Sequence, residues 1–587
     1  MYNKYYQDEL TFLREQGAEF AHAYPKIAHM LSETGADPDV ERLLEGFAFL
    51  TGRIRQKLDG ELSEFTGSLI GLLWPHYLRP IPSMTILQFD TSRRSLSETK
   101  VVARGAEVES TPVEGTPCRF RTCYDTTIYP FALEDVELAV PLSQPAHLRL
   151  AFSVTGGADI NQLLLDRLRL FLDGEPKVTY ALYLLLCRYL SKVTFRAVHA
   201  DRAGRHISFG SSTVAPVGFA DDEAILPYPA SSFPGYRLLQ EYFALPEKFL
   251  FVDVGHLEAL ARLEIEERFE IILEFSRRPD DAVRIKRDNI RLFCTPMVNL
   301  FAGRTDPLRM EHDKTEYLLR PEGDDRTHYE IFSIDAVAGW EQGSAEKREY
   351  QPFFSFKHSL GPTNQTTEYY QVEIRPAIVG RGTDTYISFV TGEQSGITPS
   401  MQTISIEITA SNRDLAEKLR VGDLNTHTAE SPAFADFSNI TKVTPTISPP
   451  LTGGIYWRLI SHLSLNYLSL LNCESLRGIL ELYNFQALYD RQAARTNELR
   501  LNGIKKVNAR PDAHLLRGSM FRGLAVDMEI DEDSFAGEGD MYLFAAILNQ
   551  FFNLYVTLNS YSRLTVKGTR YGEVFSWPPQ MGAQSLL

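Results

Sequence analysis

Apolar side chains between residues 43 and 72 recur at intervals of three and four residues. The series starts at Leu43, and its alternation of four and three is the spacing of a coiled-coil seam. One step is skipped between residues 54 and 58, as in a stutter, and Gly60 lies near this break. We predict that this apolar seam is a protein-interaction surface on helices. Its members are Leu43, Phe47, Leu50, Ile54, Leu58, Leu62, Phe65 and Leu69.

A shorter helical pattern precedes the seam. Tyr6, Leu10 and Leu13 recur at intervals of three or four residues, which is the period of an amphipathic helix. Pro25 is expected to kink or end this first helix, because proline lacks the backbone donor that a helix interior needs. The pair Asp37-Pro38 then predicts a new helix start, with aspartate as the cap and proline in the first turn. Residues 1–80 are therefore predicted to form a helical segment.

Two explanations for the seam stay open on the pattern alone. A helix pair of this size cannot easily bury such a stripe by itself. The stripe therefore packs either against another protein, in a bundle of helices, or against the downstream part of this chain. Charged residues such as Arg42, Arg53 and Asp59 lie mostly off the seam, as expected for a buried stripe under either explanation.

Prolines mark the end of the helical segment. Pro75, Pro80 and Pro82 favour extended backbone in the residues before them. We therefore interpret the segment WPHYLRPIPS, residues 74–83, as a stiff linker. The chain that follows, residues 84–275, is predicted to be a β-rich domain with inserted helices.

Local patterns inside this β-rich domain indicate individual elements. Residues 147–154 alternate apolar and polar side chains, which is typical of a half-buried strand. Residues 177–190 are apolar enough for a buried helix. Residues 233–254 are predicted to form a short helix bounded by prolines, followed by a strand.

Two more domains are predicted after residue 275. Residues 276–450 alternate short strands with polar loops, and a proline-rich end separates them from residues 451–587. In the last domain we expect a helix over residues 475–489, a buried helix over 540–553 and a strand over Tyr555–Ser560. The predicted fold class is therefore α+β and multidomain, with an N-terminal helical segment, central β-rich domains and a C-terminal α+β domain.

Charge and cysteine content narrow the class of partner. The formal net charge is -16, and no run of lysine or arginine suggests the basic surface that binds nucleic acid. The five cysteines are scattered along the chain, which fits a reducing compartment. The N-terminus lacks the pattern of a signal peptide, and no apolar run approaches the roughly 20 residues of a spanning helix. We expect protein partners, a cytoplasmic location and no direct membrane insertion.

Motifs of known chemistry are absent from the sequence. There is no phosphate-binding G-x-x-x-x-G-K-[ST] loop, no G-x-S-x-G elbow and no H-E-x-x-H zinc motif. The cluster Glu311-His312-Asp313 is adjacent in sequence, so its side chains point in different directions and do not form a metal site. We predict no catalytic residues, no cofactor and no metal.

Several long strings resemble the TssF family, also called ImpG or VasA, a baseplate subunit of the bacterial type VI secretion system. The resemblance extends over essentially the whole chain and is weakest between residues 330 and 450. The strings are YYQDELTFLREQGAEFAHAYPKIAHML (5–31), DPDVERLLEGFAFLTGRIRQKLDGEL (37–62), HYLRPIPS (76–83), FPGYRLLQEYFALPEKFLFVDV (233–254), TPMVNLFAGRTDPLRMEHDKTEYLLRP (295–321), LISHLSLNYLSLL (459–471) and GEVFSWPP (572–579).

This resemblance implies a structural role in a contractile injection device. It implies that two copies of the chain wrap one TssG and share a helical core bundle with it, which favours a partner for the seam. It further implies contacts with TssK, with TssE and with the spike protein VgrG, and a place at the inner face of the inner membrane through the baseplate and the membrane complex. The resemblance also implies that this chain is part of a wedge of the baseplate, and that this wedge seeds assembly of the tail tube and contractile sheath for effector delivery. A hydrolase and a small-ligand-binding module are the rival classes.

Overall fold

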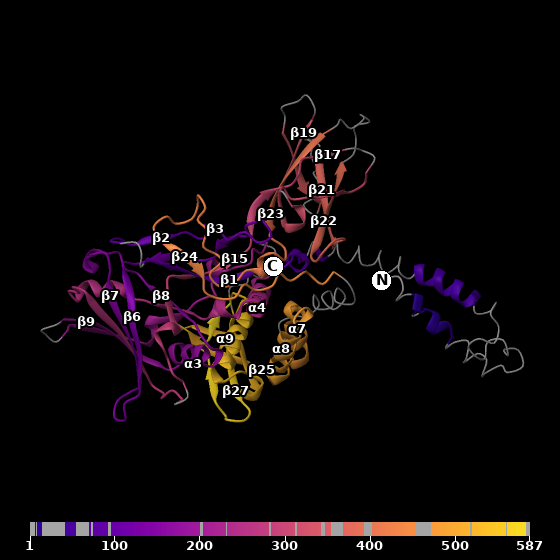
Figure 1. The fold of residues 1–587 in the computed structure, drawn as a ribbon. Coiled ribbons are helices and arrows are strands. Elements are labelled where there is room, and N and C mark those ends of the chain that lie inside the picture. The colour runs from indigo at the N-terminus through magenta and orange to yellow at the C-terminus, as the bar shows by residue number, and fades with distance from the viewer. Residues whose placement is uncertain are drawn as a thin grey trace, which may run out of the picture. The chain divides into compact units, whose positions relative to one another are not determined.

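The computed structural model divides the chain into two compact units, which are described separately (Figure 1). Unit 1 comprises Met1–Pro75 and Leu451–Ser461, and unit 2 comprises His76–Pro450 and His462–Leu587. The structure describes residues 6–7, 9–14, 42–54, 70–71, 74–91, 96–199, 204–229, 232–280, 283–310, 314–323, 325–341, 347–353, 368–391, 402–451, 471–516, 519–558 and 560–582.

Unit 1 is helical in nearly all of its described residues. Residues 6–7 and 9–14 are helical, as are residues 42–54 and 70–71. These ranges confirm that helices occupy the N-terminal segment. Their arrangement as a bundle, and the predicted domain boundaries, stay predictions. Leu58, Leu62, Phe65 and Leu69 of the seam lie outside the described residues.

Strand β1 (Met84–Asp90) organises the start of unit 2. It is central in a five-stranded sheet and pairs antiparallel with β15 on one side and β24 on the other. The pairing continues beyond β24, because Ile81 forms an antiparallel bridge with Ile447. The predicted linker at 74–83 therefore lies beside the chain that leads to residue 450. The other strands of this sheet are β3 (Glu107–Glu109), β4 (Arg119–Thr122), β15 (Cys294–Val298) and β24 (Asp436–Asn439).

Three further sheets complete the β-rich region before residue 300. The largest has the order β10-β9-β13-β7-β6, and the second has the order β11-β12-β8-β14. Alternation of apolar and polar residues explains them: Leu148, Leu150 and Phe152 of β7 are fully buried, as predicted. The strands are β2 (Lys100–Val102) paired with β5 (Thr126–Ile128), β6 (Phe131–Ala139), β7 (His147–Val154), β8 (Leu168–Leu172), β9 (Leu190–Val198), β10 (His206–Gly210), β11 (Val214–Pro216), β12 (Phe251–Val254), β13 (Arg268–Phe275) and β14 (Ile290–Leu292).

An eight-stranded sheet between residues 301 and 411 closes on itself as a barrel. Its order is β16-β23-β19-β20-β21-β22-β18, with β17 also paired to β23. A bridge between Thr305 and Pro321 joins the two ends of the sheet. Isoleucines 404, 406 and 408 of β23 supply part of the buried core. The strands are β16 (Phe301–Arg304), β17 (Leu308–Met310), β18 (Tyr317–Leu318), β19 (Glu330–Glu341), β20 (Lys347–Pro352), β21 (Glu368–Pro376), β22 (Thr383–Thr391) and β23 (Gln402–Ser411).

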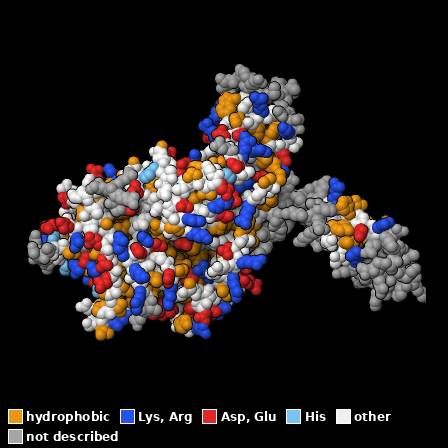
Figure 2. Space-filling view, viewed as in Figure 1, with side chains coloured by type: hydrophobic (Ala, Val, Ile, Leu, Met, Phe, Trp, Pro, Cys, Tyr) orange, Lys and Arg blue, Asp and Glu red, His pale blue; other side chains and the backbone are white. Residues whose placement is uncertain are grey.

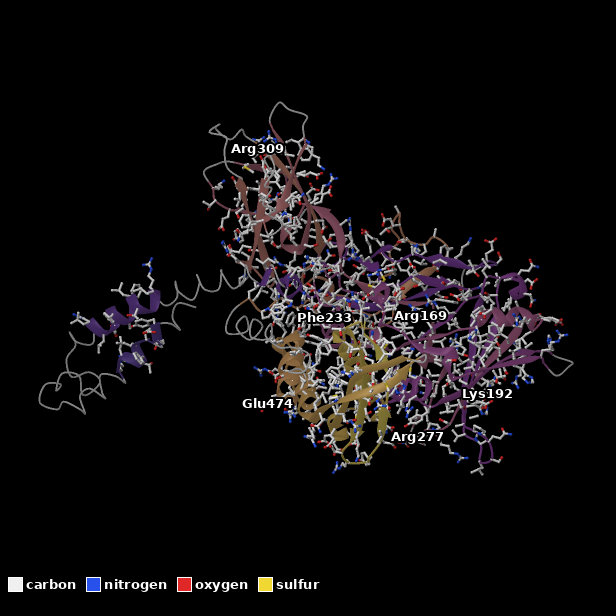
Figure 3. All side chains as sticks on the ribbon, turned by 180° about the vertical axis from the view of Figure 1, so that it is seen from behind. Arg169, Lys192, Phe233, Arg277, Arg309 and Glu474 are labelled. Carbon is white, nitrogen blue, oxygen red and sulfur yellow. The ribbon has the colours of Figure 1, made fainter. Side chains whose placement is uncertain are left out.

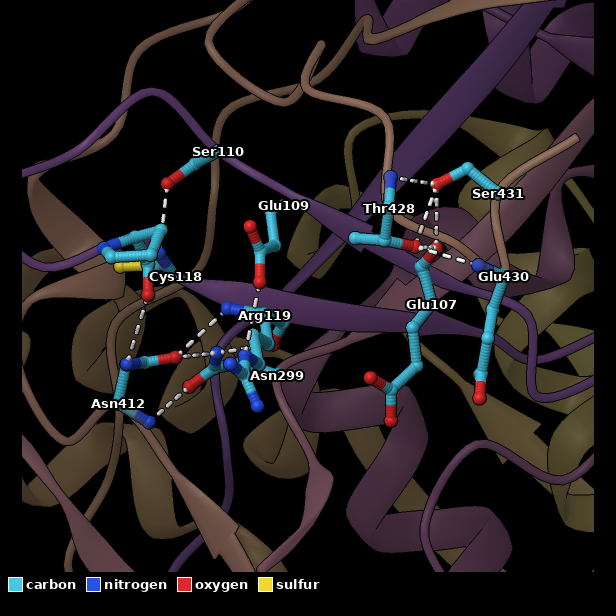
Figure 4. Close-up of polar contacts among 11 residues, drawn as sticks. Glu107, Glu109, Ser110, Cys118, Arg119, Asn299, Asn412, Thr428, Glu430 and Ser431 are labelled. Carbon is cyan, nitrogen blue, oxygen red and sulfur yellow. Dashed lines mark hydrogen bonds and ion pairs between the residues drawn. The ribbon is translucent and has the colours of Figure 1, made fainter. Parts of the chain in front are cut away.

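Two asparagines fasten the barrel to the sheet of β1 (Figure 4). Asn299 follows β15 and Asn412 follows β23, so they lie on the two chain passages between the sheet and the barrel. The Asn412 backbone N–H donates to Asn299 Oδ1 at 2.7 Å, and Asn299 Nδ2 donates to Asn412 Oδ1 at 2.9 Å and to the Arg119 carbonyl at 2.7 Å. Both side chains are buried, so these bonds satisfy polar groups that have no access to water.

The C-terminal part of unit 2 is α+β. Helix α9 (Glu538–Tyr555) contacts α3 (Pro176–Cys187) and α4 (Pro234–Ala244), and it is buried on nearly every side (Figure 1). Beside it lie α7 (Cys473–Tyr483) and α8 (Arg491–Gly503). The C-terminal sheet consists of β25 (Ile504–Leu516), β26 (Ser519–Ile530), β27 (Ser560–Gly568), β28 (Val574–Ser576) and β29 (Gln580–Met581).

Aromatic side chains join these helices to the start of unit 2. His76 stacks on Tyr228 with ring centroids 4.2 Å apart, and Tyr236 stacks on Tyr483 at 4.7 Å. Figure 3 labels Phe233 at the start of α4, where its ring packs on Tyr555 of α9 at 4.2 Å. The chain that enters unit 2 at His76 is therefore anchored in a core shared by α4, α7 and α9.

Short 3-10 turns connect many of these elements. They follow the strands and helices wherever the chain changes direction over three to six residues. They are η1 (Pro75–Leu78), η2 (Ile160–Gln162), η3 (Ser211–Thr213), η4 (Asp221–Glu223), η5 (Pro246–Phe249), η6 (Leu257–Arg262), η7 (Arg287–Asn289), η8 (Arg326–His328), η10 (Ala416–Lys418), η11 (Phe485–Leu488) and η12 (Glu532–Ser534).

The α+β multidomain fold class is confirmed, and one predicted strand is wrong. The helices predicted at 177–190, 475–489 and 540–553 correspond to α3, α7 with η11, and α9. The strand predicted over Tyr555–Ser560 is wrong at residues 555–558, because α9 continues to Tyr555, whose ring packs on Phe233 and Tyr236, and strand β27 begins only at Ser560. Helix α8 was not predicted, because its polar sequence shows little apolar periodicity.

We predict that Lys248→Met strongly destabilises unit 2. Lys248 pairs with Glu241, both side chains are fully buried, and Glu241 Oε1 also accepts from the Ile225 and Leu226 backbone N–H groups at 2.8 Å. Removing the lysine leaves a buried carboxylate without its cation, so the free energy of unfolding in urea should fall by about 3–5 kcal/mol. The exposed Arg205–Glu264 pair provides the control. Arg205→Met should change the free energy of unfolding by less than about 1 kcal/mol. Equal effects of the two substitutions would contradict this prediction.

The stability of unit 2 should fall as the pH drops below 6.5. Burial, and then the charge of Arg79, lower the pKa of His76 from 6.5 to about 3. Between these values the unfolded chain binds a proton at His76 and the folded chain does not, so acid favours unfolding by about 1.4 kcal/mol per pH unit. Urea unfolding at pH 7.5 and 5.5 should show a smaller difference for His76→Phe than for the parent. The exposed His206→Phe variant should retain the parent's dependence.

Candidate functional site

The described half of the apolar seam lies on the helix formed by residues 42–54 of unit 1. The exposed fractions are 73% for Leu43, 61% for Phe47, 58% for Leu50 and 61% for Ile54. At 100° per residue, the four side chains point within an arc of about 60° around the helix axis. The structure therefore brings them together on one open face, which Figure 2 shows as hydrophobic side chains on the described part of the N-terminal helices.

The same helix has a second apolar face that is already covered. Ala48 and Gly52 are buried and lie about 130° and about 170° around the helix from the centre of the seam. Small residues at this i, i+4 spacing allow close packing of neighbouring backbone. This face was not predicted from the sequence, although the small side chains at positions 48 and 52 are the signal that marks it. Phe49, which is 46% exposed on a third side, was not predicted either.

The free energy gained by burying the seam determines how much of it a partner must cover to bind stably. Fully burying a Leu, Ile or Phe side chain is worth about 1.5–3 kcal/mol, so the four described side chains contribute about 6–12 kcal/mol. Association itself costs about 4–15 kcal/mol before any contact is made. The described four therefore give little net affinity, and a stable complex requires the seam to be covered over more of its length or from two sides.

Unit 2 presents a different kind of surface. On the sheet of β7, Arg149 pairs with Asp135 at 2.7 Å, with Glu137 at 2.8 Å and with Glu270 at 3.2 Å. Lysine, arginine and acidic side chains alternate across the visible face in Figure 2. Such cross-strand ion pairs are typical of a solvated sheet face. This face does not resemble the contiguous apolar stripe of the helix at 42–54.

The described residues of unit 2 contain a hollow of about 250 Å³ between α3 and the start of α9. One of the cations that line it, Arg277, donates to Tyr189 Oη at 2.6 Å and pairs with Glu538 at 2.7 Å. Within the described ranges, no three histidine, cysteine, aspartate or glutamate side chains are grouped as metal ligands. Every described helix is too short or too polar to cross a bilayer. The cluster Glu311-His312-Asp313 lies outside the described residues.

These features define a multidomain α+β protein whose candidate site is an exposed helical interface. The family model for "Type VI secretion system, TssF" matches residues 2–584. The chain therefore belongs to the TssF family.

The chain is also similar over its whole length to characterised relatives. It is 31% identical to the type VI secretion system component TssF1 of Pseudomonas aeruginosa over 627 aligned residues, covering 100% of this chain and 99% of that protein. A chain in the cryo-electron microscopy structure of a TssK-TssF-TssG baseplate subcomplex matches with a TM-score of 0.77 and 32% identity, covering 93% of this chain and 99% of the other. A chain in a structure of the type VI baseplate complex matches with a TM-score of 0.62 and 29% identity over the full length of both.

We predict that Leu50→Gln leaves the helix at 42–54 as stable as in the parent. The side chain is mostly exposed, so the substitution should change the local stability by less than about 0.5 kcal/mol. Ala48→Gln on the same helix should instead destabilise it by about 1–3 kcal/mol, because position 48 is fully buried. Amide hydrogen exchange over residues 42–54 of the full chain measures both changes. Faster exchange in Leu50→Gln than in Ala48→Gln would show that the two faces are assigned the wrong way round.

Proposed function

We propose that this chain is a structural wedge component of the type VI secretion baseplate. In this role it assembles with TssG, TssK and TssE around the spike protein VgrG, together with a second copy of itself. The wedge seeds the tail tube and the contractile sheath that deliver effectors. Membership of the TssF family supports this proposal, as does the similarity to a chain solved together with TssK and TssG.

The open seam is the observation that carries the proposal. Leu43, Phe47, Leu50 and Ile54 form a contiguous apolar stripe that unit 1 leaves exposed. Exposed stripes of this kind mark interaction sites on native proteins. An amphipathic helix with anchors at these spacings is a recurring mode of recognition between helices. We assign the seam to the contact with TssG.

The proposed role is mechanical and needs no cofactor, metal or catalytic group. Several buried charges of unit 2 neutralise one another: Arg500 binds both oxygens of the buried Asp540 at 2.9 and 3.0 Å, and Lys248 pairs with Glu241. Such pairs fix the packing of α8 against α9 and of α4 against η5. The proposed location is cytoplasmic, at the inner face of the inner membrane, reached through the baseplate and the membrane complex.

Phe47→Asp tests the proposed function. A carboxylate in the middle of the seam would be buried without a partner in the complex, so the variant should lose co-purification with the cognate TssG. The side chain is exposed in unit 1, so the variant should fold, which circular dichroism checks. Leu142→Asp is the matched control, because Leu142 is 93% exposed in unit 2 and lies off the seam. Capture of TssG by the Phe47→Asp variant at the parent's level would refute the assignment.

A further inference from the structure

Gly46 occupies a helical position where nothing in the described part of unit 1 requires glycine. It lies in the middle of the helix at 42–54, and its backbone does not adopt a positive φ angle. A Cβ atom built at Gly46 meets no other atom within 4 Å. Glycine in a helix interior is nevertheless about fivefold less favourable than alanine, because it loses more backbone freedom on folding. The free chain therefore contains an unfavourable residue for which the packing of the described residues offers no reason.

Other glycines in helices of this chain do have such a reason. A Cβ atom at Gly539 in α9 would lie 2.1 Å from the Tyr180 carbonyl oxygen, and one at Gly235 in α4 would lie 3.0 Å from the Phe551 ring of α9. In both helices the missing side chain allows a neighbouring element to approach closely. The same explanation at Gly46 requires a neighbour that the described residues of unit 1 do not supply.

The position of Gly46 points to the neighbour. Leu43 precedes it by three residues and Leu50 follows it by four, so both are its direct neighbours on the helix surface. Gly46 therefore forms a notch along one edge of the apolar seam, walled by two large exposed side chains. An exposed glycine beside an exposed apolar stripe lets a second helix approach its backbone and insert a side chain between the two leucines.

We propose that Gly46 is the crossing point at which a partner helix packs most closely on the seam, with a large apolar side chain of that helix filling the notch. This inference rests on the proposed function and specifies the geometry of the same site. A helix is the fitting occupant because the four described seam residues run along the axis for about 16 Å with a spacing of four and three, which matches another helix. TssG, present with TssK and TssF in the similar subcomplex, is the probe protein.

A series of substitutions at Gly46 in the full-length chain tests this inference. Gly46→Ala should increase helix protection in the free chain, because alanine favours the helix. It should at the same time weaken binding of co-expressed, purified TssG about tenfold, because one methyl group overfills a close-packed contact. Gly46→Leu should weaken binding about a hundredfold. Hydrogen exchange over residues 42–54 and titration with TssG measure the two effects separately.

The matched control is Glu45→Leu. Glu45 is exposed on the opposite side of the same helix from the seam, so added bulk there should leave binding of TssG unchanged. Binding by Gly46→Ala that equals or exceeds that of the parent would overturn the crossing point. If Phe47→Asp still abolishes binding in that case, the seam remains the interface and only the notch is wrong. If both variants bind like the parent, the proposed function of the seam fails as well.

Discussion

The antiparallel pairing of β1 with both β15 and β24 is the constraint on which unit 2 depends. Thr85 and Thr441 are 356 residues apart along the chain, yet their hydroxyl groups lie 2.9 Å from each other. The pairing extends to the bridge between Ile81 and Ile447, so the chain enters and leaves this sheet along neighbouring segments. The barrel inserted between these two segments is attached to this sheet at Asn299 and Asn412.

Sequence patterns predicted the elements of this fold better than their connections. Alternation along β7 and the apolar run of α3 are local signals, because burial acts directly on each side chain. The pairing of β1 with β24 has no local signal, since it depends on which of many similar strands meets it. Helix α8 was not predicted because few of its residues face the core and so it lacks an apolar period. The structure shows its start at Asp490, whose side chain accepts hydrogen bonds from the backbone N–H groups of Gln492 and Ala493.

The seam illustrates the same division at the candidate site. Its spacing predicted one helical face, and Leu43, Phe47, Leu50 and Ile54 do lie on one open face of the helix at 42–54. The spacing did not distinguish a stripe covered by this chain from one left for another protein, because both have the same period. Glycine at position 46 does not contribute to the apolar period of the sequence. The open space around its Cα atom, which suggests a close contact with a partner, is a property of the folded helix.

The two asparagines at the base of the barrel make it an exchangeable module. The Asn412 backbone N–H donates a hydrogen bond to the Asn299 side chain, so the chain enters the barrel and leaves it at nearly the same point. A segment whose ends meet in this way is shortened, lengthened or replaced during evolution without disturbing the sheet that carries it. A change in the length of the barrel's loops therefore leaves the sheet of β1 with the same two points of attachment.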